Sequence, residues 1–308
     1  MKAVLILFLV AVPLRAAPAP YGILLLAHGG DASWNGEIEK LRVQVNAKVP
    51  AETALGMADP RSLQAAVDRL EKRGVARIVA VPLFVQSRSE VLDQMRYALG
   101  LTDKPSEALR AGLERMAAAH AGHAAGGVNP HAASMGHAHA FSLERVKARA
   151  PLVLTPALDD HPLGARILTE RAKALSKKPA RETVVLVAHG PSDDAALPAW
   201  EAALANLAAA VKEGGQYKGA VSVMLRDDSP PPVRAAAVVK LRQIVAGGAA
   251  KGRVLVVPVL IARGGIEKKI VKDLDGLDYA WDGKTLMPHA GFDAWVLDRA
   301  ASAAGKVR

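Results

Sequence analysis

Several residue types that build common functional sites are missing or scarce in this sequence of 308 residues. It has no cysteine, which excludes disulfide bonds and thiolate ligands, so a metal site must use His, Asp, Glu or Met. Aromatic residues make up only 4%, and compact Lys/Arg runs are absent, so we expect no nucleic-acid partner. The Gly-x-Ser-x-Gly turn of many serine hydrolases is absent too.

Positive charge is present in excess. The sequence has 40 Lys and Arg against 30 Asp and Glu, a formal net charge of +10. Such a surface attracts anions, either anionic lipid or a small substrate with several carboxylates, and we favour the small substrate.

The N-terminal residues read MKAVLILFLVAVPLRAAPAP. One Lys, a short apolar run and small residues in this order are typical of a secretory signal peptide, and the run is too short to span a membrane comfortably. We expect residues 1–19 to be removed and the protein to be exported, periplasmic or secreted, without stable membrane insertion. An uncleaved anchor or a wrongly assigned start codon is the alternative.

Strand-like and helix-like segments alternate along the chain. GILLLAHGG (22–30) is followed by EIEKLRVQVNAKV (37–49), and SLQAAVDRLEKRG (62–74) has apolar residues at helical spacing before ARIVAVPLFV (76–85). A continuous β-branched run is typical of a strand buried on both faces. The alternation predicts an α/β fold with a parallel sheet covered by helices.

The pattern occurs twice. Three pairs of segments recur in the same order, namely ILLLAHG (23–29) with VVLVAHG (184–190), RIVAVPLFV (77–85) with RVLVVPVLI (253–261), and HPLGARILTERA (161–172) with HAGFDAWVLDRA (289–300). Three matches in one order indicate an internal duplication. We expect one domain over residues 20–178 and a second over 179–308, joined near 176–182, and a monomer because the duplication supplies both halves.

A His-rich stretch interrupts the first half. Residues 117–140 contain five of the nine histidines, with Ala and Gly between them and without apolar periodicity, namely His120, His123, His131, His137 and His139. We interpret this stretch as an insertion that collects metal ions, flanked by helices near 88–116 and 141–149. An alanine- and glycine-rich spacer with incidental histidines is the alternative.

A histidine follows the first predicted strand of each half, at His28 and His189. Ligands of parallel α/β sheets bind at the carboxyl ends of the strands, and the glycine after each histidine permits a tight turn. Neutral imidazole binds divalent metals or accepts a proton near neutral pH. A carboxylate follows the third strand of each half, at Glu90 and Glu267. We therefore predict His28, Glu90, His189 and Glu267 as metal-binding residues; solvated carboxylates are the alternative.

These features resemble the class II chelatases, specifically the sirohydrochlorin cobaltochelatase and ferrochelatase family. The matching segments are LLLAHGG (24–30), MADPRSLQAAVDRLEKRGVARIVAVPLFV (57–85) and LDDHPLGARILTER (158–171). The resemblance implies two flavodoxin-like halves around a cleft, in which Co²⁺ or Fe²⁺ is inserted into a polycarboxylate tetrapyrrole, with no organic cofactor. It also implies catalytic roles for His28, Glu90 and His189, and substrate carboxylates bound by Arg88, Arg263, Lys268 and Lys269.

The sequence departs from this family at one position. A second His usually follows the third strand, and alignment through VPLF places Glu90 there, with Ile266 and the adjacent Glu267 in the second half. Protohaem ferrochelatases pair a His with a Glu, so His28 with Glu90 is chemically competent. Two hypotheses follow, a chelatase or a non-catalytic periplasmic protein that binds metal or tetrapyrrole. Imidazole with carboxylate also accepts Ni²⁺ and Zn²⁺, so the metal stays open.

Overall fold

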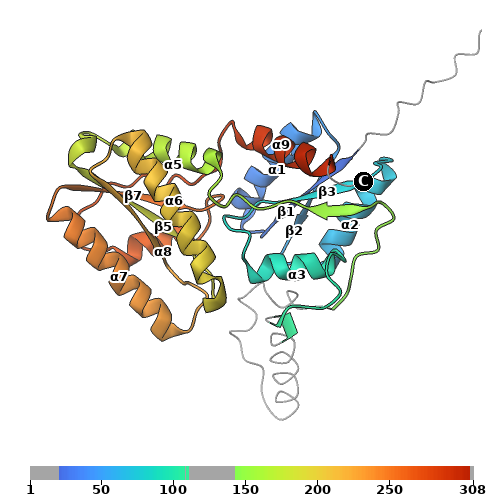
Figure 1. The fold of residues 1–308 in the computed structure, drawn as a ribbon, viewed down its shortest axis with the longest axis horizontal. Coiled ribbons are helices and arrows are strands. Elements are labelled where there is room, and N and C mark those ends of the chain that lie inside the picture. Colours follow the sequence, from blue (N-terminus) through green and yellow to red (C-terminus); the bar gives the residue numbers. More distant parts are fainter. Residues whose placement is uncertain (1–20, 108, 111–142, 306–308) are drawn as a thin grey trace, which may run out of the picture.

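The computed structural model describes residues 21–107, 109–110 and 143–305. Over these ranges the chain forms two parallel β-sheets flanked by helices, which lie side by side along the long axis of the molecule (Figure 1). This confirms the predicted α/β fold with two parallel-sheet halves. The predicted signal peptide and the His-rich segment lie outside the described residues.

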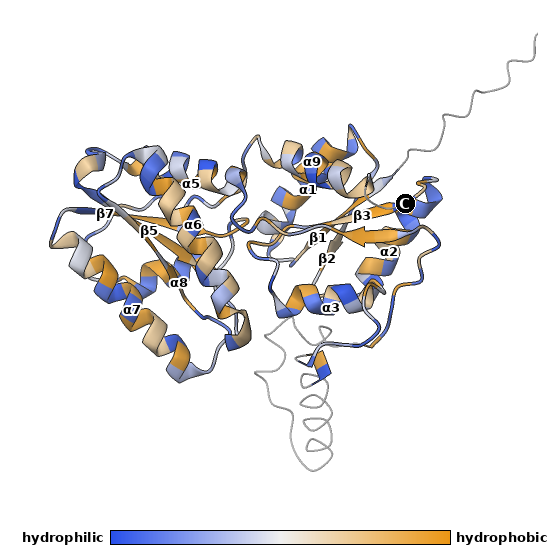
Figure 2. Cartoon of the chain, viewed as in Figure 1, coloured by the Kyte–Doolittle hydropathy of each residue, from blue (hydrophilic) through white to orange (hydrophobic). Residues whose placement is uncertain are grey.

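The first sheet has four strands in the order β2-β1-β3-β4, all parallel. Its strands are β1 (Gly22–Ala27), β2 (Ala51–Leu55), β3 (Ile78–Pro82) and β4 (Leu152–Leu154). Every residue of β1 and β3 is buried, as their continuous apolar runs predict, and the strands are mostly apolar in Figure 2. Burial on both faces follows because helices cover both sides of the sheet.

The second sheet has three parallel strands in the order β6-β5-β7. Its strands are β5 (Glu182–Ala188), β6 (Gly219–Met224) and β7 (Arg253–Val259). This order repeats β2-β1-β3 of the first sheet. β7 corresponds to β3 in this comparison. An isolated parallel bridge joins Ala280 to Leu255 of β7, so Ala280 lies where β4 lies in the first sheet. The shared strand order supports the predicted duplication.

Helices connect and cover the strands. The first half contains α1 (Ala32–Asn46), α2 (Pro60–Lys72) and α3 (Glu90–Ala98), and the second contains α6 (Leu197–Gly215), α7 (Pro231–Ala249) and α8 (Ile266–Asp273), with short 3₁₀ turns at Pro179–Arg181 and Asp194–Ala196. α2 illustrates how the sequence builds them. Asp59 caps it, Pro60 begins it, and the apolar residues at helical spacing are buried, since one stripe of the helix faces the sheet.

The last helix of each half packs against the other half. α5 (Pro162–Leu175) lies on α6 and β7, whereas α9 (Phe292–Ala304) lies on α1, β3 and β4, as Figure 1 also shows. Arg299 of α9 donates to the carbonyl of Ala157 at 3.4 Å, and Arg171 of α5 donates to the carbonyl of Thr285 at 3.0 Å. The predicted domain boundary at residues 178 and 179 stays a prediction. α5 and α9 each pack on the half that lies on the other side of this boundary.

The helices expected beside the His-rich segment differ from those observed. α3 ends at Ala98 and is followed by Gly100 with φ +75°, so the helix expected over 88–116 does not run through residues 99–106. The helix expected over 141–149 is wrong for its described part, because residues 143–149 contain no helix. Instead, Val146 N donates to the carbonyl of Ala98, and Lys147 N donates to Gln64, so contacts with α2 and α3 override local helix propensity.

None of the described helices is long and apolar enough to cross a bilayer.

Candidate metal centre

Loops at the carboxyl ends of the strands meet between the two halves. Gln86, after β3, donates to the carbonyl of Ala199 at 3.0 Å. Trp200 of α6 donates through Nε1 to the carbonyl of Arg88 at 2.9 Å. Since ligands of parallel sheets bind at this end of the strands, a ligand site is expected at the junction.

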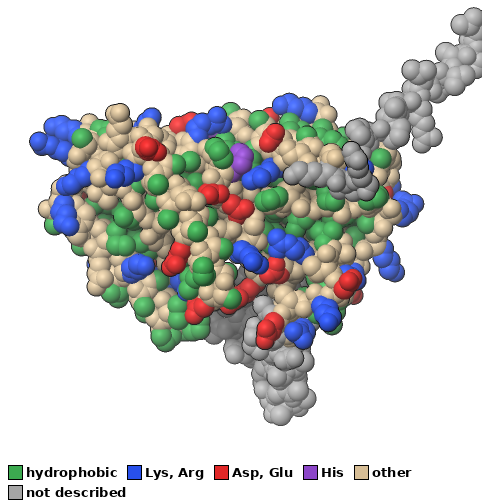
Figure 3. Space-filling view, viewed as in Figure 1, with side chains coloured by type: hydrophobic (Ala, Val, Ile, Leu, Met, Phe, Trp, Pro, Cys, Tyr) green, Lys and Arg blue, Asp and Glu red, His purple; other side chains and the backbone are tan. Residues whose placement is uncertain are grey.

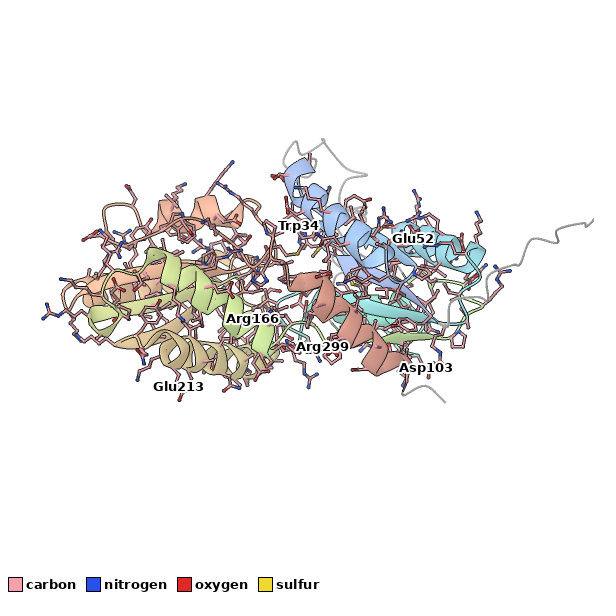
Figure 4. The ribbon with its side chains drawn as sticks, turned by 90° about the horizontal axis from the view of Figure 1, so that it is seen from above. Trp34, Glu52, Asp103, Arg166, Glu213 and Arg299 are labelled. Atoms are coloured by element: carbon pink, nitrogen blue, oxygen red, sulfur yellow. The ribbon has the colours of Figure 1, made fainter. Side chains whose placement is uncertain are left out.

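A second tryptophan approaches the junction from the first half. Trp34, in the first turn of α1, lies between the halves in Figure 4. A Cβ added to Gly264, which follows β7, would lie 3.6 Å from the Trp34 ring. Trp34 and Trp200 thus occupy corresponding places in the two halves.

His28 follows β1 directly, as predicted, and its side chain is exposed. Its Nδ1 lies 2.6 Å from the carbonyl oxygen of Gly29. Because a carbonyl oxygen only accepts, this contact places the proton of the neutral ring on Nδ1 and leaves the Nε2 lone pair free for a metal or a proton. Gly29 has φ +81°, which explains why glycine follows the histidine.

Glu90 begins α3 and is half-buried. Its Oε1 accepts a hydrogen bond of 2.8 Å from the Ser192 hydroxyl, three residues after His189. The described partner of Glu90 therefore belongs to the second half. The sequence predicted that Glu90 stands opposite His28, and no contact in the described chain joins the two side chains.

His189 follows β5 in the same way that His28 follows β1. Its Nδ1 lies 2.8 Å from the carbonyl oxygen of Gly190, which has φ +80°. Its Nε2 lies 3.3 Å from Oδ2 of Asp228. Ligand atoms of His189, Asp227 and Asp228 all lie within 4.8 Å of one another, so these three side chains could hold one metal ion.

The side chain of Asp227 is the least exposed of this trio, at 5%. Its Oδ1 accepts from Arg234 Nε at 2.8 Å, and its Oδ2 pairs with Lys269 Nζ. Burial acts to raise the pKa of Asp227, but the hydrogen bonds from Lys269 and Arg234 outweigh it and hold that pKa below its usual range. Asp227 is therefore ionised at neutral pH.

Arg226 fixes the loops that carry these side chains. It is buried, with φ +54°, and its amide donates to the carbonyl of His189 at 2.8 Å. Its guanidinium donates to the carbonyl of Pro191 at 2.6 Å and to the carboxylate of Asp194 at 2.6 Å. The loop after β5 is thereby tied to the loop after β6.

The remaining predicted residues have different surroundings. Glu267 is 5% exposed, and both of its oxygens accept from the amide of Gly264, at 3.1 and 3.0 Å. In the described chain the acids beside His189 are Asp227 and Asp228, and Glu267 instead holds the turn before α8. Arg88 and Arg263 are exposed on loops after β3 and β7, and Lys268 is exposed on α8.

The sequence patterns did not lead to Asp227 and Asp228 as candidate ligands. The available signal was VMLRDDSP (223–230), a strand-like run that ends in two acids. β6 pairs with β5 in parallel, so both strands end at the same edge of the sheet and bring the acids to His189.

The surface carries charges of both signs and two hollows. Figure 3 shows Lys and Arg side chains mixed with Asp and Glu on the face in view, rather than one large patch of a single sign. Two hollows of about 390 and 490 Å³ lie on α2 and on α6, away from the strand-end histidines. The cleft expected between the halves stays a prediction.

Known proteins resemble this chain in sequence family and in fold. The CbiX family model matches residues 22–175, a range that includes His28 and Glu90. SirB from Bacillus subtilis with Fe³⁺ has a TM-score of 0.57 and 16% identity, covering 93% of this chain and 98% of that chain. The sirohydrochlorin chelatase SirB from Bacillus subtilis subspecies spizizenii in complex with cobalt has a TM-score of 0.55 and 13% identity, covering 92% and 95%. No curated protein sequence matches significantly.

Proposed function

This chain belongs to the CbiX family of class II tetrapyrrole chelatases, and from this premise we propose that it inserts Co²⁺ or Fe²⁺ into sirohydrochlorin or a related polycarboxylate tetrapyrrole, as in cobalamin or sirohaem biosynthesis. The observation that carries the proposal is the position of His28, at a strand end inside the matched range, with its Nε2 lone pair free.

The reaction requires a group of this kind. Metal insertion removes two pyrrole N–H protons and strips water from the incoming ion. An imidazole with a free Nε2 holds the ion or takes a proton, and a carboxylate near the junction accepts another. Glu90, which Ser192 holds in place at 2.8 Å, supplies that carboxylate.

Cationic side chains for binding the substrate carboxylates are exposed on both sides of the junction. Arg88 is exposed in the first half, and Arg263 and Lys268 are exposed in the second. Guanidinium groups bind carboxylates through paired hydrogen bonds, and the net charge of +10 favours the approach of a polyanion.

The test is metal insertion followed by absorption spectroscopy. Purified protein, sirohydrochlorin and either Co²⁺ or Fe²⁺ are mixed, and the rate is compared with spontaneous insertion. We expect His28→Ala to lower the catalysed rate by about 100-fold or more, because a positioned base contributes on that order. His289→Ala is the matched control, since the His289 imidazole accepts a hydrogen bond from the Gly291 amide and contacts the Glu170 carboxylate instead.

A second candidate is a non-catalytic protein that binds metal or tetrapyrrole. It is favoured by Glu90, which stands where the family usually has a histidine and is bound to Ser192 rather than to His28. Tight tetrapyrrole binding with insertion no faster than the spontaneous rate would establish this alternative.

Export and metal collection belong to the same proposal. The N-terminal sequence supports removal of residues 1–19 and a periplasmic or secreted location. The five histidines of residues 117–140 would gather scarce metal ions and raise their concentration near His28. Both segments lie outside the described residues, so their support is the sequence.

A further inference from the structure

The second half contains a group of metal-ligating side chains outside the range matched by the family. His189, Asp227 and Asp228 each offer one ligand atom within 4.8 Å of the others. Ligands of one first-row ion lie within about 4.2 Å of each other, because each is about 2.1 Å from the ion. The side chain of Asp228 is 70% exposed and approaches only to 3.3 Å from His189 Nε2, so rotation of this exposed carboxylate can close the remaining distance.

The imidazole of His189 already has the tautomer that metal coordination through Nε2 requires. The contact of Nδ1 with the carbonyl of Gly190 leaves Nε2 as the free nitrogen, and Nε2 is the atom that faces Asp228. Arg226 ties the loop that carries His189 to the loop that carries both acids. The three ligands are therefore carried by two loops that Arg226 connects.

A cationic side chain, Lys269, already contacts one of these three residues. Lys269 extends its ammonium group to Oδ2 of Asp227, yet its side chain is 53% exposed. Arg234 differs, because it is 18% exposed and also binds Asp273 at 2.5 Å. A lysine on a flexible stem can leave at little cost, whereas the doubly bound arginine stays.

We propose that His189, Asp227 and Asp228 form a second divalent-metal site, and that the ammonium group of Lys269 fills it until a metal ion displaces it. The charges support this exchange. With Lys269 removed, Arg234 is balanced by Asp273, and two carboxylates remain to neutralise one divalent ion.

The donor set indicates the class of metal. Two carboxylates and one imidazole suit Mn²⁺, Fe²⁺ and Co²⁺, whereas imidazole alone, as in residues 117–140, favours Ni²⁺, Cu²⁺ and Zn²⁺. Mn²⁺ is therefore the probe that separates this site from the His-rich segment. The inference concerns metal binding and does not depend on tetrapyrrole metallation.

The experiment titrates full-length protein with Mn²⁺ alone and counts free Mn²⁺ by electron paramagnetic resonance. We expect Asp228→Asn to lose one bound equivalent, because it removes an exposed ligand without disturbing the core. The matched control is Asp103→Asn, another exposed Asp, which lies in the first half away from the junction (Figure 4), and it should keep that equivalent. His28→Ala should also keep it, so failure of the chelatase proposal is distinguishable.

Lys269→Met tests the displacement directly. Lys269 is the exposed member of the pair, and removing its ammonium group, which competes with the metal for Asp227, should tighten Mn²⁺ binding by about fivefold. Equal Mn²⁺ stoichiometry in wild-type protein and Asp228→Asn would overturn the site. Unchanged or weaker binding by Lys269→Met would overturn the role given to Lys269.

Discussion

At the scale of single residues, the four described histidines form two matched pairs. His28 and His189 donate through Nδ1 to the carbonyl of the next residue. His161 and His289 instead accept through Nδ1, from the amides of Leu163 and Gly291, at 3.1 and 3.0 Å. The first pair therefore leaves Nε2 unprotonated, exposed in His28 and facing Asp228 in His189, whereas the second pair holds the first turns of α5 and α9.

The helix cap at His161 should make stability depend on pH. Burial lowers the pKa of His161, and the nearby charge of Arg299 lowers it further. The unfolded chain then binds this proton more readily, so stability is full above about pH 6.5, the ordinary histidine value, and declines as pH falls toward the lower pKa of the folded state.

His161→Asn tests this prediction, because asparagine also caps helices but does not titrate. We expect the variant to lose less stability than the wild type between pH 7.5 and 5.5, as measured by urea unfolding. His161→Ala should cost about 1 kcal/mol at pH 7.5 because it removes the cap. Identical pH dependence in the wild type and His161→Asn would contradict the assignment.

At the scale of elements, Glu182 organises the connection between α5 and β5. It is 1% exposed, and it accepts from the Ser176 hydroxyl, from the amides of Lys177 and Lys178 at 2.8 and 3.1 Å, and from Arg253 at 3.3 Å. Burial acts to raise its pKa, but these donors outweigh burial and hold the pKa below the usual range.

Glu182→Gln should destabilise the protein by roughly 1–3 kcal/mol at neutral pH, because charge-assisted hydrogen bonds to a buried group are lost. The wild-type carboxylate contributes fully above about pH 4.3, the unfolded value, and its contribution disappears as pH falls through the lower folded pKa. Chemical unfolding at pH 7 and pH 3 measures the difference, which should shrink in acid. Glu201→Gln, at an exposed position of α6, should have little effect at either pH.

The His-rich segment is also an element whose role can be measured. Deletion of residues 117–140 should leave the rate at saturating metal unchanged, but lower the rate when metal is limiting. Calorimetric titration with Ni²⁺ at pH 7.5 should show fewer bound ions in the deletion variant, and the difference should vanish near pH 5 as the imidazoles protonate. Equal stoichiometry at pH 7.5 would rule out metal collection.

At the scale of the whole molecule, exchange of α5 and α9 makes the two halves depend on each other. Phe292, Trp295 and Val296 of α9 are buried in a core that also contains Val79 and Val81 of β3. Arg166 of α5 and Arg299 of α9 both lie near the middle of the molecule in Figure 4. One hydrophobic core therefore extends across the junction.

Separate fragments should consequently fold poorly. A fragment of residues 20–178 lacks α9, and its β3 would expose apolar surface; a fragment of residues 179–308 lacks α5 over β7. We expect each fragment alone to aggregate and the two together to form a soluble complex when co-expressed, as size-exclusion chromatography would detect. Soluble, cooperatively unfolding single fragments would contradict this dependence.

The sequence by itself determined the features that rest on local patterns. Continuous apolar runs identified β1, β3, β5 and β7, because a strand buried on both faces needs them. The repeated strand–His–Gly pattern placed His28 and His189 correctly at strand ends, and Gly29 and Gly190 have the positive φ that such turns need. The order of repeated segments likewise indicated two similar sheets.

Only the tertiary structure decided which side chains meet. Glu90 contacts Ser192, 102 residues away, and His189 meets Asp227 and Asp228 rather than Glu267. α5 and α9 cover the sheet of the opposite half. Hydrophobic periodicity records whether a residue is buried, but it carries no information on which element buries it. That choice depends on how two sheets and their exchanged helices pack, and it brings the ligands of the second half together.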